Sequence, residues 1–470
     1  MPKPLLESAD LVRLTRVSET PLEVREGFEQ YLTPYQTARL AASLFSNRDG
    51  GSLRCLDLGA GTGILSVAIY ERYGTSVSID AVEIDPDMAK ICEVELKGLG
   101  VEHETFVEDA LGCNLQGSYD RVILNPPYRK LAATDPWQDD LPVKVPNLYA
   151  AFVVKACSYL SNQGECVAII PRSWMNGSYF SGFRAWLYAH CSIDAIHIYD
   201  SRRDVFDDTD VLQEVMILKL SRLPQAPQVC VSTSTGKSDQ RIVSHSYAFE
   251  SLVDVSRADS PMRVKPDIHA HNLQTLREIG LLASTGKVVE YRQREGLKAQ
   301  GGEGVDPLLY PCNFSLCGMR HPIECAKPQW ISRDYPNEAS LLLPAGTYVV
   351  VKRFSSKEQQ RRVMAFVLQT ASRVALENHL NYIHAGTSRH TSPLNEAVAR
   401  GLCLWLNSGY VDETFRSVSG STQVNASDLN AMPTPGCKTL GELGVLWRDG
   451  MSSNQIDAIV EGLLSNGHFV

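Results

Sequence analysis

The sequence lacks long hydrophobic runs, internal repeats and low-complexity segments. None of its 470 residues falls in an apolar stretch of about 18 or more, the length that a membrane-spanning helix needs. The opening MPKPLLESAD has no apolar core of the kind found in a signal peptide. We therefore expect a cytoplasmic protein without a membrane partner.

The chain also lacks close cysteine pairs. Its twelve cysteines are scattered, and no C-x-x-C occurs. In a reducing compartment, scattered cysteines behave as small apolar residues and do not form a disulfide framework. Cys312, Cys317 and Cys325, with His321, form one cluster, but structural zinc sites usually show two close ligand pairs. We expect no metal.

An excess of positive charge is missing too, since the formal net charge is −9. The charge is uneven: residues 1–222 carry 21 basic and 31 acidic residues, whereas residues 223–470 carry 24 and 23. The run at 349–366 contains Lys352, Arg353, Lys357, Arg361 and Arg362 against a single acid. Such a run is more often a solvated face, although a surface that follows DNA phosphates has the same composition.

The first half alternates strand-like and helix-like segments. Strands are predicted at 53–59, 77–85, 103–109, 119–125, 165–171, 193–200 and 214–220, and helices at 64–74, 87–100, 147–164 and 179–191. This alternation is typical of an α/β fold with a doubly wound, mostly parallel sheet. The last two strands have no helix between them, which predicts an antiparallel hairpin at one edge.

The second half is mixed and less regular. Residues 223–235 hold two prolines and many small polar residues, and they read as a linker. This predicts domains at 1–222 and 223–470, the second of mixed α+β type. Within it we expect strands at 346–354 and 373–378 and helices at 356–368 and 394–409.

A glycine-rich turn follows the first strand. In LDLGAGTGILS, Gly59, Gly61 and Gly63 allow a tight turn and let a ligand approach the backbone closely. The next strand ends in an acid, Glu83, which can accept hydrogen bonds from ribose hydroxyls, and Ile84 can pack on a base. The pattern favours nucleoside binding over the alternative of a helix-entry Asp85 and a core Ile84.

The segment VILNPPY ends a strand with two prolines. Proline cannot donate to a sheet ladder, so the strand must end at Leu124 and NPPY must form a stiff loop at the carboxyl edge of the sheet. There the Asn125 side-chain oxygen and the Pro126 carbonyl can accept hydrogen bonds from the two N–H groups of an amine. Pro127 stiffens the loop and Tyr128 offers a ring for stacking a base.

The order of these motifs resembles the S-adenosylmethionine-dependent methyltransferases, in particular the γ arrangement of DNA adenine-N6 methyltransferases with a TaqI-like catalytic domain. The resemblance implies a flipped-out adenine in double-stranded DNA. It also assigns cofactor contacts to Thr33, Pro34, Asp57, Gly59, Gly61, Glu83, Ile84 and Asp109. By the same resemblance, Phe206 is the second wall of the base pocket, and Arg202 and Arg203 lie near phosphates.

The second half is similar to the BsuBI/PstI group of type II modification methylases, most clearly at SGSTQVNASDL and ENHLNY. Amide side chains can read adenine edges and hydroxyls suit phosphates. The expected DNA contacts are Lys352, Arg353, Arg361, Asn378, Asn381, Ser419, Gly420, Thr422, Gln423 and Asn425. For each residue taken singly, loop or helix capping is the alternative.

Three other functions remain open from the residues. A glutamine methyltransferase of release factors shares NPPY, but such proteins are short and place their extra domain first. RNA and N4-cytosine methyltransferases use the same fold, and a DNA-binding module without activity would keep only the relic of a site. No PD-x(n)-E-x-K nuclease pattern is evident, so we expect methylation without cleavage, and the resemblance suggests a separate endonuclease partner.

Overall fold

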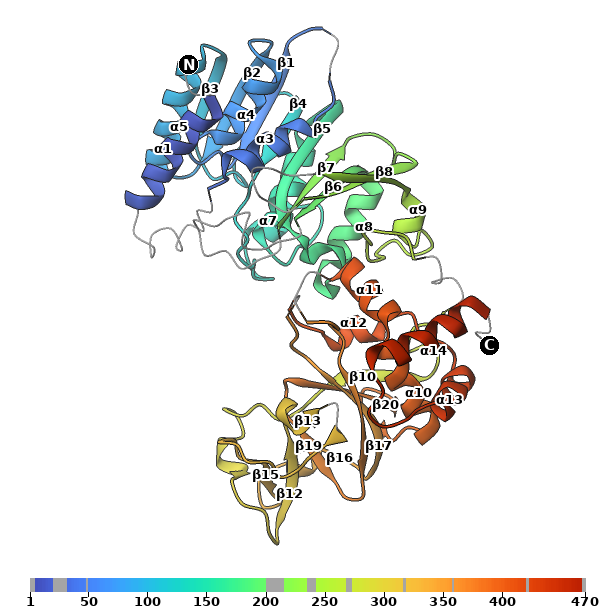
Figure 1. The fold of residues 1–470 in the computed structure, drawn as a ribbon. Coiled ribbons are helices and arrows are strands. Elements are labelled where there is room, and N and C mark those ends of the chain that lie inside the picture. The colour runs from blue at the N-terminus through green and yellow to red at the C-terminus, as the bar shows by residue number, and fades with distance from the viewer. Residues whose placement is uncertain are drawn as a thin grey trace. The chain divides into compact units, whose positions relative to one another are not determined.

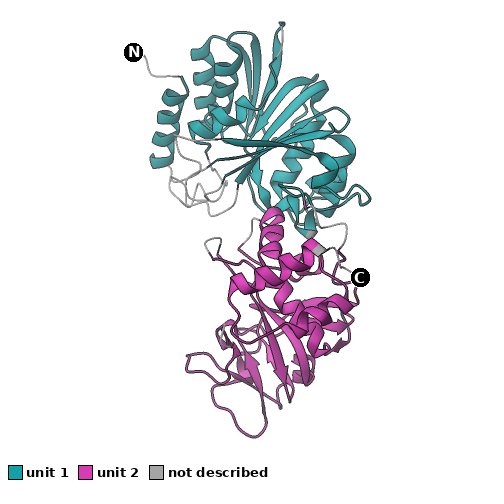
Figure 2. Cartoon of the chain, turned by 45° about the vertical axis from the view of Figure 1, so that its right-hand side comes forward, with its two compact units in different colours: residues 1–266 teal, residues 267–470 magenta. Residues whose placement is uncertain are grey.

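The computed structural model describes residues 5–19, 32–47, 50–199, 215–234, 242–267, 273–315, 318–356, 359–419 and 422–466. The chain forms two compact units, Met1–Pro266 and Asp267–Val470 (Figure 2). No helix of the described residues combines the length and the apolar character needed to cross a bilayer.

Unit 1 is built on one sheet with the strand order β3-β2-β1-β4-β5-β7-β6-β8-β9 (Figure 1). Its strands are β1 (Leu53–Leu58), β2 (Val77–Glu83), β3 (Glu102–Val107), β4 (Tyr119–Leu124), β5 (Leu160–Pro171), β6 (Ser192–Tyr199), β7 (Val215–Ser221), β8 (Gln228–Ser234) and β9 (Val243–Ala248). The pairs among β1 to β5 are parallel, while β7 runs antiparallel to both neighbours. The strand order reverses between β1 and β4: the chain runs outward from β1 to β3 on one side and continues with β4 on the other side. Such a switch point is where α/β proteins bind ligands.

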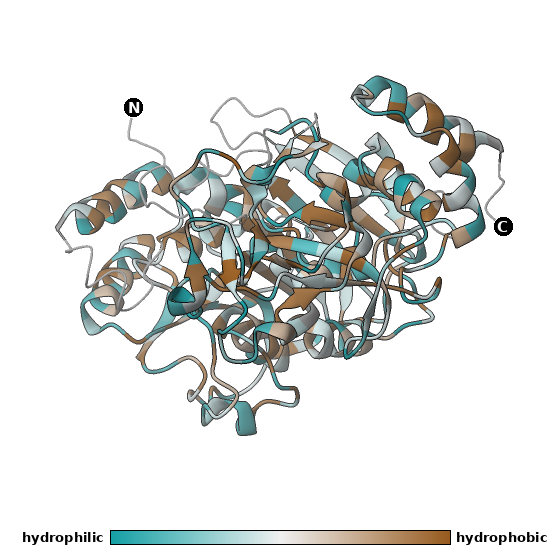
Figure 3. Ribbon diagram, turned by 90° about the horizontal axis from the view of Figure 1, so that it is seen from below, coloured by the Kyte–Doolittle hydropathy of each residue, from teal (hydrophilic) through white to brown (hydrophobic). Residues whose placement is uncertain are grey.

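Eight helices of unit 1 are described, and they include the four predicted from the sequence, although the one predicted at 147–164 ends at Ser158 because β5 begins at Leu160. They are α1 (Leu5–Glu19), α3 (Tyr35–Ser43), α4 (Ile64–Tyr73), α5 (Pro86–Leu99), α6 (Trp137–Asp140), α7 (Leu148–Ser158), α8 (Ser181–His190) and α9 (Phe249–Leu252). The first four contact one another as one group, and α7 packs against β5. Strand interiors carry the core, for example the fully buried Ile79, Val122 and Ile169. Figure 3 shows hydrophobic residues on both the strands and the helices.

The boundary between the units differs from the predicted one. The expected linker at 223–235 contains β8, which pairs in parallel with β6, and β9 then pairs with β8. The first unit therefore ends at residue 266, and the boundary at 222 was wrong because β8 completes the sheet. The hairpin of β6 and β7 is antiparallel as predicted, but β8 and β9 lie outside it, so it is not at the edge.

Unit 2 contains two larger sheets and one small one. Their strand orders are β10-β20-β17-β18 with β21 paired to β20, β11-β15-β12-β19-β16, and β13-β14. The strands are β10 (Leu281–Thr285), β11 (Leu297–Lys298), β12 (Val305–Leu309), β13 (Phe314–Ser315), β14 (Gly318–Met319), β15 (Trp330–Ser332), β16 (Leu342–Leu343), β17 (Gly346–Lys352), β18 (Ala365–Thr370), β19 (Val374–Leu376), β20 (Leu380–Gly386) and β21 (Thr391–Ser392). The mixed α+β character agrees with the prediction.

Five helices complete the described part of unit 2. They are α10 (Glu396–Leu406), α11 (Gly409–Val418), α12 (Ala426–Asn430), α13 (Cys437–Val445) and α14 (Ser453–Asn466). The helix predicted at 394–409 is present as α10, whereas the one predicted at 356–368 is wrong. Its second half is β18, which pairs with β17 from Gly346↔Thr370 to Val351↔Ala365.

Candidate active site

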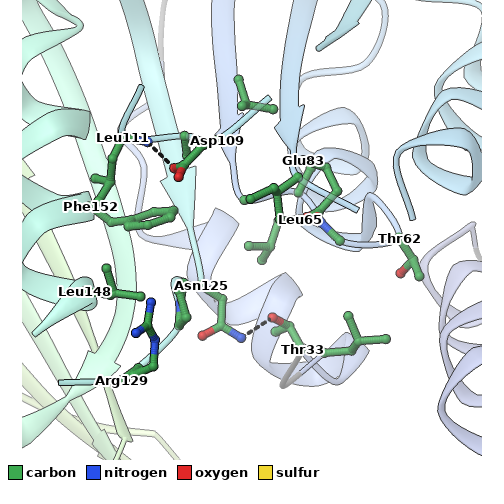
Figure 4. Close-up of a pocket in the computed structure, with 18 of the residues that line it drawn as sticks. Thr33, Thr62, Leu65, Glu83, Asp109, Leu111, Asn125, Arg129, Leu148 and Phe152 are labelled. Carbon is green, nitrogen blue, oxygen red and sulfur yellow. Dashed lines mark hydrogen bonds between the residues drawn. The ribbon is translucent and has the colours of Figure 1, made fainter. Parts of the chain in front are cut away.

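A cavity of about 230 Å³ lies at the carboxyl ends of the parallel strands of unit 1 (Figure 4). Eight of the residues predicted from the sequence as cofactor or catalytic residues line it: Thr33, Gly59, Gly61, Glu83, Ile84, Asp109, Asn125 and Pro127. The segment before α3, the glycine turn and the ends of β2, β3 and β4 therefore meet in one place.

The glycine turn forms the floor between β1 and α4. Gly59, Gly61 and Gly63 have φ values of 83°, 55° and 86°, which favour glycine. A Cβ atom on Gly61 would lie 3.0 Å from Leu32, and one on Gly63 would lie 2.9 Å from the Cys92 sulfur. The turn thus keeps backbone N–H groups close to the cavity, and side chains in its place would collide with the wall.

Glu83 is fixed at the end of β2. Its Oε2 accepts a hydrogen bond from the Gly61 N–H at 2.7 Å, and its Oε1 accepts one from the Asp85 N–H at 2.9 Å. Only 8% of Glu83 is exposed, and this burial raises the pKa of its carboxyl group. A carboxylate has about four acceptor positions, so the fixed group retains the capacity to bind ribose hydroxyls.

Of the alternative left by the sequence, a helix-entry Asp85 and a core Ile84, the structure shows only the first half. Asp85 is indeed a helix-entry residue, because its side chain accepts from the N–H groups of Asp87 at 2.9 Å and Met88 at 3.3 Å. Ile84, in contrast, is no core residue, since 54% of it is exposed at the cavity wall. An apolar side chain held in the open beside a carboxylate suits a nucleoside, with its flat base and its sugar hydroxyls.

Asp109 lies across the cavity from the glycine turn. Its Oδ1 accepts from the Leu111 N–H at 2.9 Å, which fixes the carboxylate after β3. The same cavity is also lined by the apolar side chains of Leu111, Trp137 and Phe152. The polar edge and the apolar walls form a compartment that matches a purine carrying an exocyclic amine.

Asn125 is held from two sides in the NPPY loop. Its Nδ2 donates to the Thr33 Oγ1 at 2.9 Å, and its Oδ1 accepts from the Tyr128 hydroxyl at 2.9 Å. These two hydrogen bonds fix the orientation of the carboxamide, with Nδ2 toward Thr33 and Oδ1 toward Tyr128. Pro126 and Tyr128 are buried and do not line the cavity; Tyr128 is 7% exposed and meets the Tyr149 ring edge-on at 6.4 Å. The use of Tyr128 as a stacking surface stays a prediction.

Two predicted cofactor residues support the cavity without lining it. Asp57 is fully buried, and its Oδ2 accepts from both the N–H and the hydroxyl of Ser66, at 3.0 and 2.7 Å. Its Oδ1 has no partner among the described residues, and burial raises the pKa of this carboxyl group to about 7. Pro34 is the residue that precedes α3. Both act on the elements that carry the site.

Several lining residues carry no motif and were missed from the sequence. Arg129 directly follows NPPY and lines the cavity, as do Leu111, Trp137, Leu148 and Phe152. Leu148 and Phe152 belong to α7, which follows the long connection after β4. No local sequence pattern therefore links them to NPPY. Position next to NPPY is the only signal that would have found Arg129. Phe206, Arg202, Arg203 and Gly420 lie outside the described residues.

In unit 2, segments predicted to contact DNA meet after β17. The Arg353 N–H donates to the His379 carbonyl at 2.9 Å, and the Arg353 carbonyl accepts from the Val424 N–H at 2.8 Å. Phe354 forms an isolated β-bridge with Gln423. We call this the β17-end region, which consists of residues 352–356, 377–379 and 422–425.

Four of the residues predicted to contact DNA have structural contacts instead. Asn381 is fully buried, and its Nδ2 donates to a backbone carbonyl at 2.6 Å. Arg361 pairs with Asp457, Asn425 forms the capping box of α12, and Ser419 is 2% exposed. We assign Asn381, Arg361, Asn425 and Ser419 to the support of the fold, because their polar groups are engaged or covered. The others, Lys352, Arg353, Asn378, Thr422 and Gln423, lie in the β17-end region.

Comparisons with known proteins agree with this arrangement. The family described as Eco57I restriction-modification methylase matches residues 79–206. The chain is 34% identical to the Type II methyltransferase M.BsuBI of Bacillus subtilis, with 98% of each chain covered. It is 31% identical to M.PstI of Providencia stuartii, covering 95% of this chain and 93% of that protein. A cryoEM structure of a DrdV–DNA complex has the same fold, with a TM-score of 0.55 and 12% identity over 94% of this chain and 59% of that one.

Proposed function

This chain belongs to the family of type II methyltransferases, enzymes that use S-adenosylmethionine to methylate DNA in restriction–modification systems, and from that premise we propose that its target is the N6 amine of a flipped-out adenine. The membership confirms the resemblance to the BsuBI/PstI group. The observation that carries the choice of adenine is the Asn125 carboxamide, held between Thr33 and Tyr128 at the cavity wall.

The residues of the cavity fit S-adenosylmethionine. Gly61 and Leu32 both line the cavity, and a Cβ atom on Gly61 would lie only 3.0 Å from the Leu32 side chain, so a residue other than glycine would crowd this wall. Glu83 would hold the ribose, and Ile84 and Asp109 would flank the adenine of the cofactor. When bound, this cofactor supplies a methyl group on a sulfonium centre, an electrophile that needs no metal.

The chain's own residues then supply orientation. The lone pair of an adenine amine is conjugated into the ring, so the amine is a poor nucleophile. The Asn125 Oδ1 and the Pro126 carbonyl would accept hydrogen bonds from the two N–H groups of the amine. These bonds would favour a pyramidal, more nucleophilic nitrogen. Thr33 and Tyr128 keep the carboxamide from rotating, which holds the acceptor in place before the substrate arrives.

We propose that unit 2 recognises the target sequence and that residues of the β17-end region contact DNA. In support, Lys352, Arg353 and Thr422 gather there from distant parts of the sequence. A separate endonuclease for the same site and a cytoplasmic location stay predictions. The DNA sequence is open; a PstI-like CTGCAG is the expectation from family resemblance alone.

Transfer of a tritiated methyl group from S-adenosylmethionine to unmethylated genomic DNA tests the proposal. The expected product after nucleoside digestion is N6-methyladenine, and sequencing of modified positions supplies the target. Label in N4-methylcytosine, in RNA or in protein, with none in adenine of DNA, would contradict it. Label in RNA would support an RNA methyltransferase, and label in protein would support a glutamine methyltransferase of release factors, which shares the NPPY loop.

A further inference from the structure

Unit 2 contains a second cavity, of about 330 Å³, in the β17-end region. The lining residues are Tyr310, Pro311, Cys312, Lys327, Lys352, Phe354, Glu377 and His379. It is separate from the cofactor cavity, since every lining residue belongs to unit 2. The lining holds two lysines, aromatic rings and one carboxylate, that of Glu377, which is engaged by His379. Lysines beside aromatic rings suit a ligand with both a flat apolar group and a negative charge.

Phe354 is an exposed aromatic residue on a fixed backbone. Its exposed fraction is 42%, a large area for a phenylalanine side chain. The bridge to Gln423 fixes its backbone, and its ring lies 5.1 Å from the His379 ring with 39° between the planes. The ring therefore has a defined position while part of its surface remains available for contact.

Buried Glu377 orients the second ring. Glu377 is 1% exposed; its Oε2 accepts from the His379 N–H at 2.9 Å, and its Oε1 bonds the imidazole Nδ1. The His379 side chain itself is 49% exposed. The buried Glu377 carboxylate thus fixes the exposed imidazole ring of His379 beside the Phe354 ring.

Lys352 supplies a cation without an acidic partner in the described part of the chain. Its Nζ lies 5.4 Å from the centre of the Phe366 ring, and partial burial lowers its pKa. Lys327, in contrast, pairs with Glu290 at 3.1 Å. A partly desolvated ammonium group that lines the same cavity as the exposed Phe354 ring is a favourable place for a phosphate.

We propose that this cavity binds one unstacked nucleotide of the DNA, with its base against Phe354 and its phosphate beside Lys352. The inference rests on the proposed function and adds a second contact point to it. Inside a duplex both faces of a base are covered, so contact with Phe354 requires a local distortion of the DNA. Aromatic side chains that stack on bases contribute strongly to affinity, and a nearby lysine adds a salt-dependent part.

Steady-state kinetics on the full chain test the two side chains. Phe354→Ala is expected to raise the KM for DNA about 10-fold or more. Lys352→Gln is expected to raise it and to reduce the salt dependence of DNA binding by about one phosphate contact. Affinity for S-adenosylmethionine should not change in either variant. Matched controls are Tyr291→Ala, which removes a ring that is 74% exposed elsewhere in unit 2, and Lys298→Gln in β11.

Phe354→Tyr keeps the ring and should restore the KM, which separates loss of stacking from loss of folding. A duplex carrying 2-aminopurine at each position of the mapped site gives a second readout. Wild-type protein should raise the fluorescence at the target adenine and at one further position, and Phe354→Ala should remove only the latter. Fluorescence at the target alone, or an unchanged KM in both variants, would overturn the inference while leaving adenine methylation intact. Absence of N6-methyladenine with wild-type protein would instead contradict the proposed function.

Discussion

At the scale of single residues, Asn125 combines a motif that the sequence shows with a support that it does not. Thr33, which the resemblance assigned to the cofactor and not to Asn125, lies 92 residues before Asn125 and accepts a hydrogen bond from its Nδ2. Asn125→Ala removes the acceptor for the amine but no contact to the glycine turn or to Glu83. We expect methyl transfer to fall at least about 100-fold, with cofactor affinity largely kept.

Single-turnover rates and equilibrium binding of S-adenosylmethionine measure the two effects separately. Thr33→Val is the matched variant, since it leaves Asn125 in place and removes only one of its hydrogen bonds. It should lower the rate by less than Asn125→Ala. Loss of cofactor binding in Asn125→Ala would show that the loop belongs to the cofactor site and not to the amine site.

Asp57 gives a pH-dependent prediction. Burial raises its pKa from 3.8 to about 7, so the proton binds more tightly in the folded state. The stability that this residue contributes is fully present below about pH 4 and is lost as the pH rises through 7. Asn does not titrate, so Asp57→Asn should gain stability relative to wild type between pH 5 and pH 8, on the order of 2 kcal/mol.

Chemical denaturation without cofactor, at several pH values, measures this difference. Asp139→Asn, which changes an exposed acid in α6, is the control for the loss of one surface carboxylate. A difference for Asp57→Asn that does not vary with pH would mean that the buried carboxylate stays charged at neutral pH.

The position of a residue at the cavity was predictable where one short segment contains the motif, and less so where a distant contact decides. The glycine turn, Glu83 and Asn125 line the cavity because each stands at or directly after the end of a strand. Asn381 has the same amide group as Asn125, but it lies in β20 with its side chain bonded to the backbone. Composition alone cannot separate these two cases, because burial is a property of the packed molecule.

At the scale of elements, α10 and α13 pack closely through two glycines. A Cβ atom on Gly444 would overlap the Ala397 carbonyl oxygen, and one on Gly401 would overlap that of Leu440. Gly444→Ala should therefore separate the helices and destabilise unit 2 by about 1–3 kcal/mol. Thermal unfolding is the measurement.

Gly441 provides the matched control on the same helix. A Cβ atom there meets nothing within 4 Å, so Gly441→Ala should stabilise the helix by about 0.5–1 kcal/mol through its higher helix propensity. Equal effects of the two substitutions would contradict the close packing of α10 on α13.

The same scale shows why one predicted helix was wrong. Residues 356–368 contain good helix formers and a suitable charge pattern, yet residues 365–370 extend a sheet as β18. The partner strand β17 ends at Lys352, and pairing with it buries Leu368. Tertiary pairing overrides local propensity here. In unit 1 the regular alternation of strands and helices left little such competition, and that fold class was predicted correctly.

At the scale of the whole molecule, the position of the boundary decides which fragment folds. A break at residue 222 would remove β8 and β9 and expose the edge of β6, and it would also remove the buried side chains of Val229 and Leu252 from the core. Unpaired strand edges promote aggregation.

A fragment of residues 1–266 should unfold cooperatively and bind S-adenosylmethionine, because every residue lining the cofactor cavity lies within it. A fragment of residues 1–222 should be less stable and prone to aggregate. Calorimetry of the two fragments, with cofactor titration, checks this, and equal melting temperatures would place the domain boundary back at the proline-rich segment.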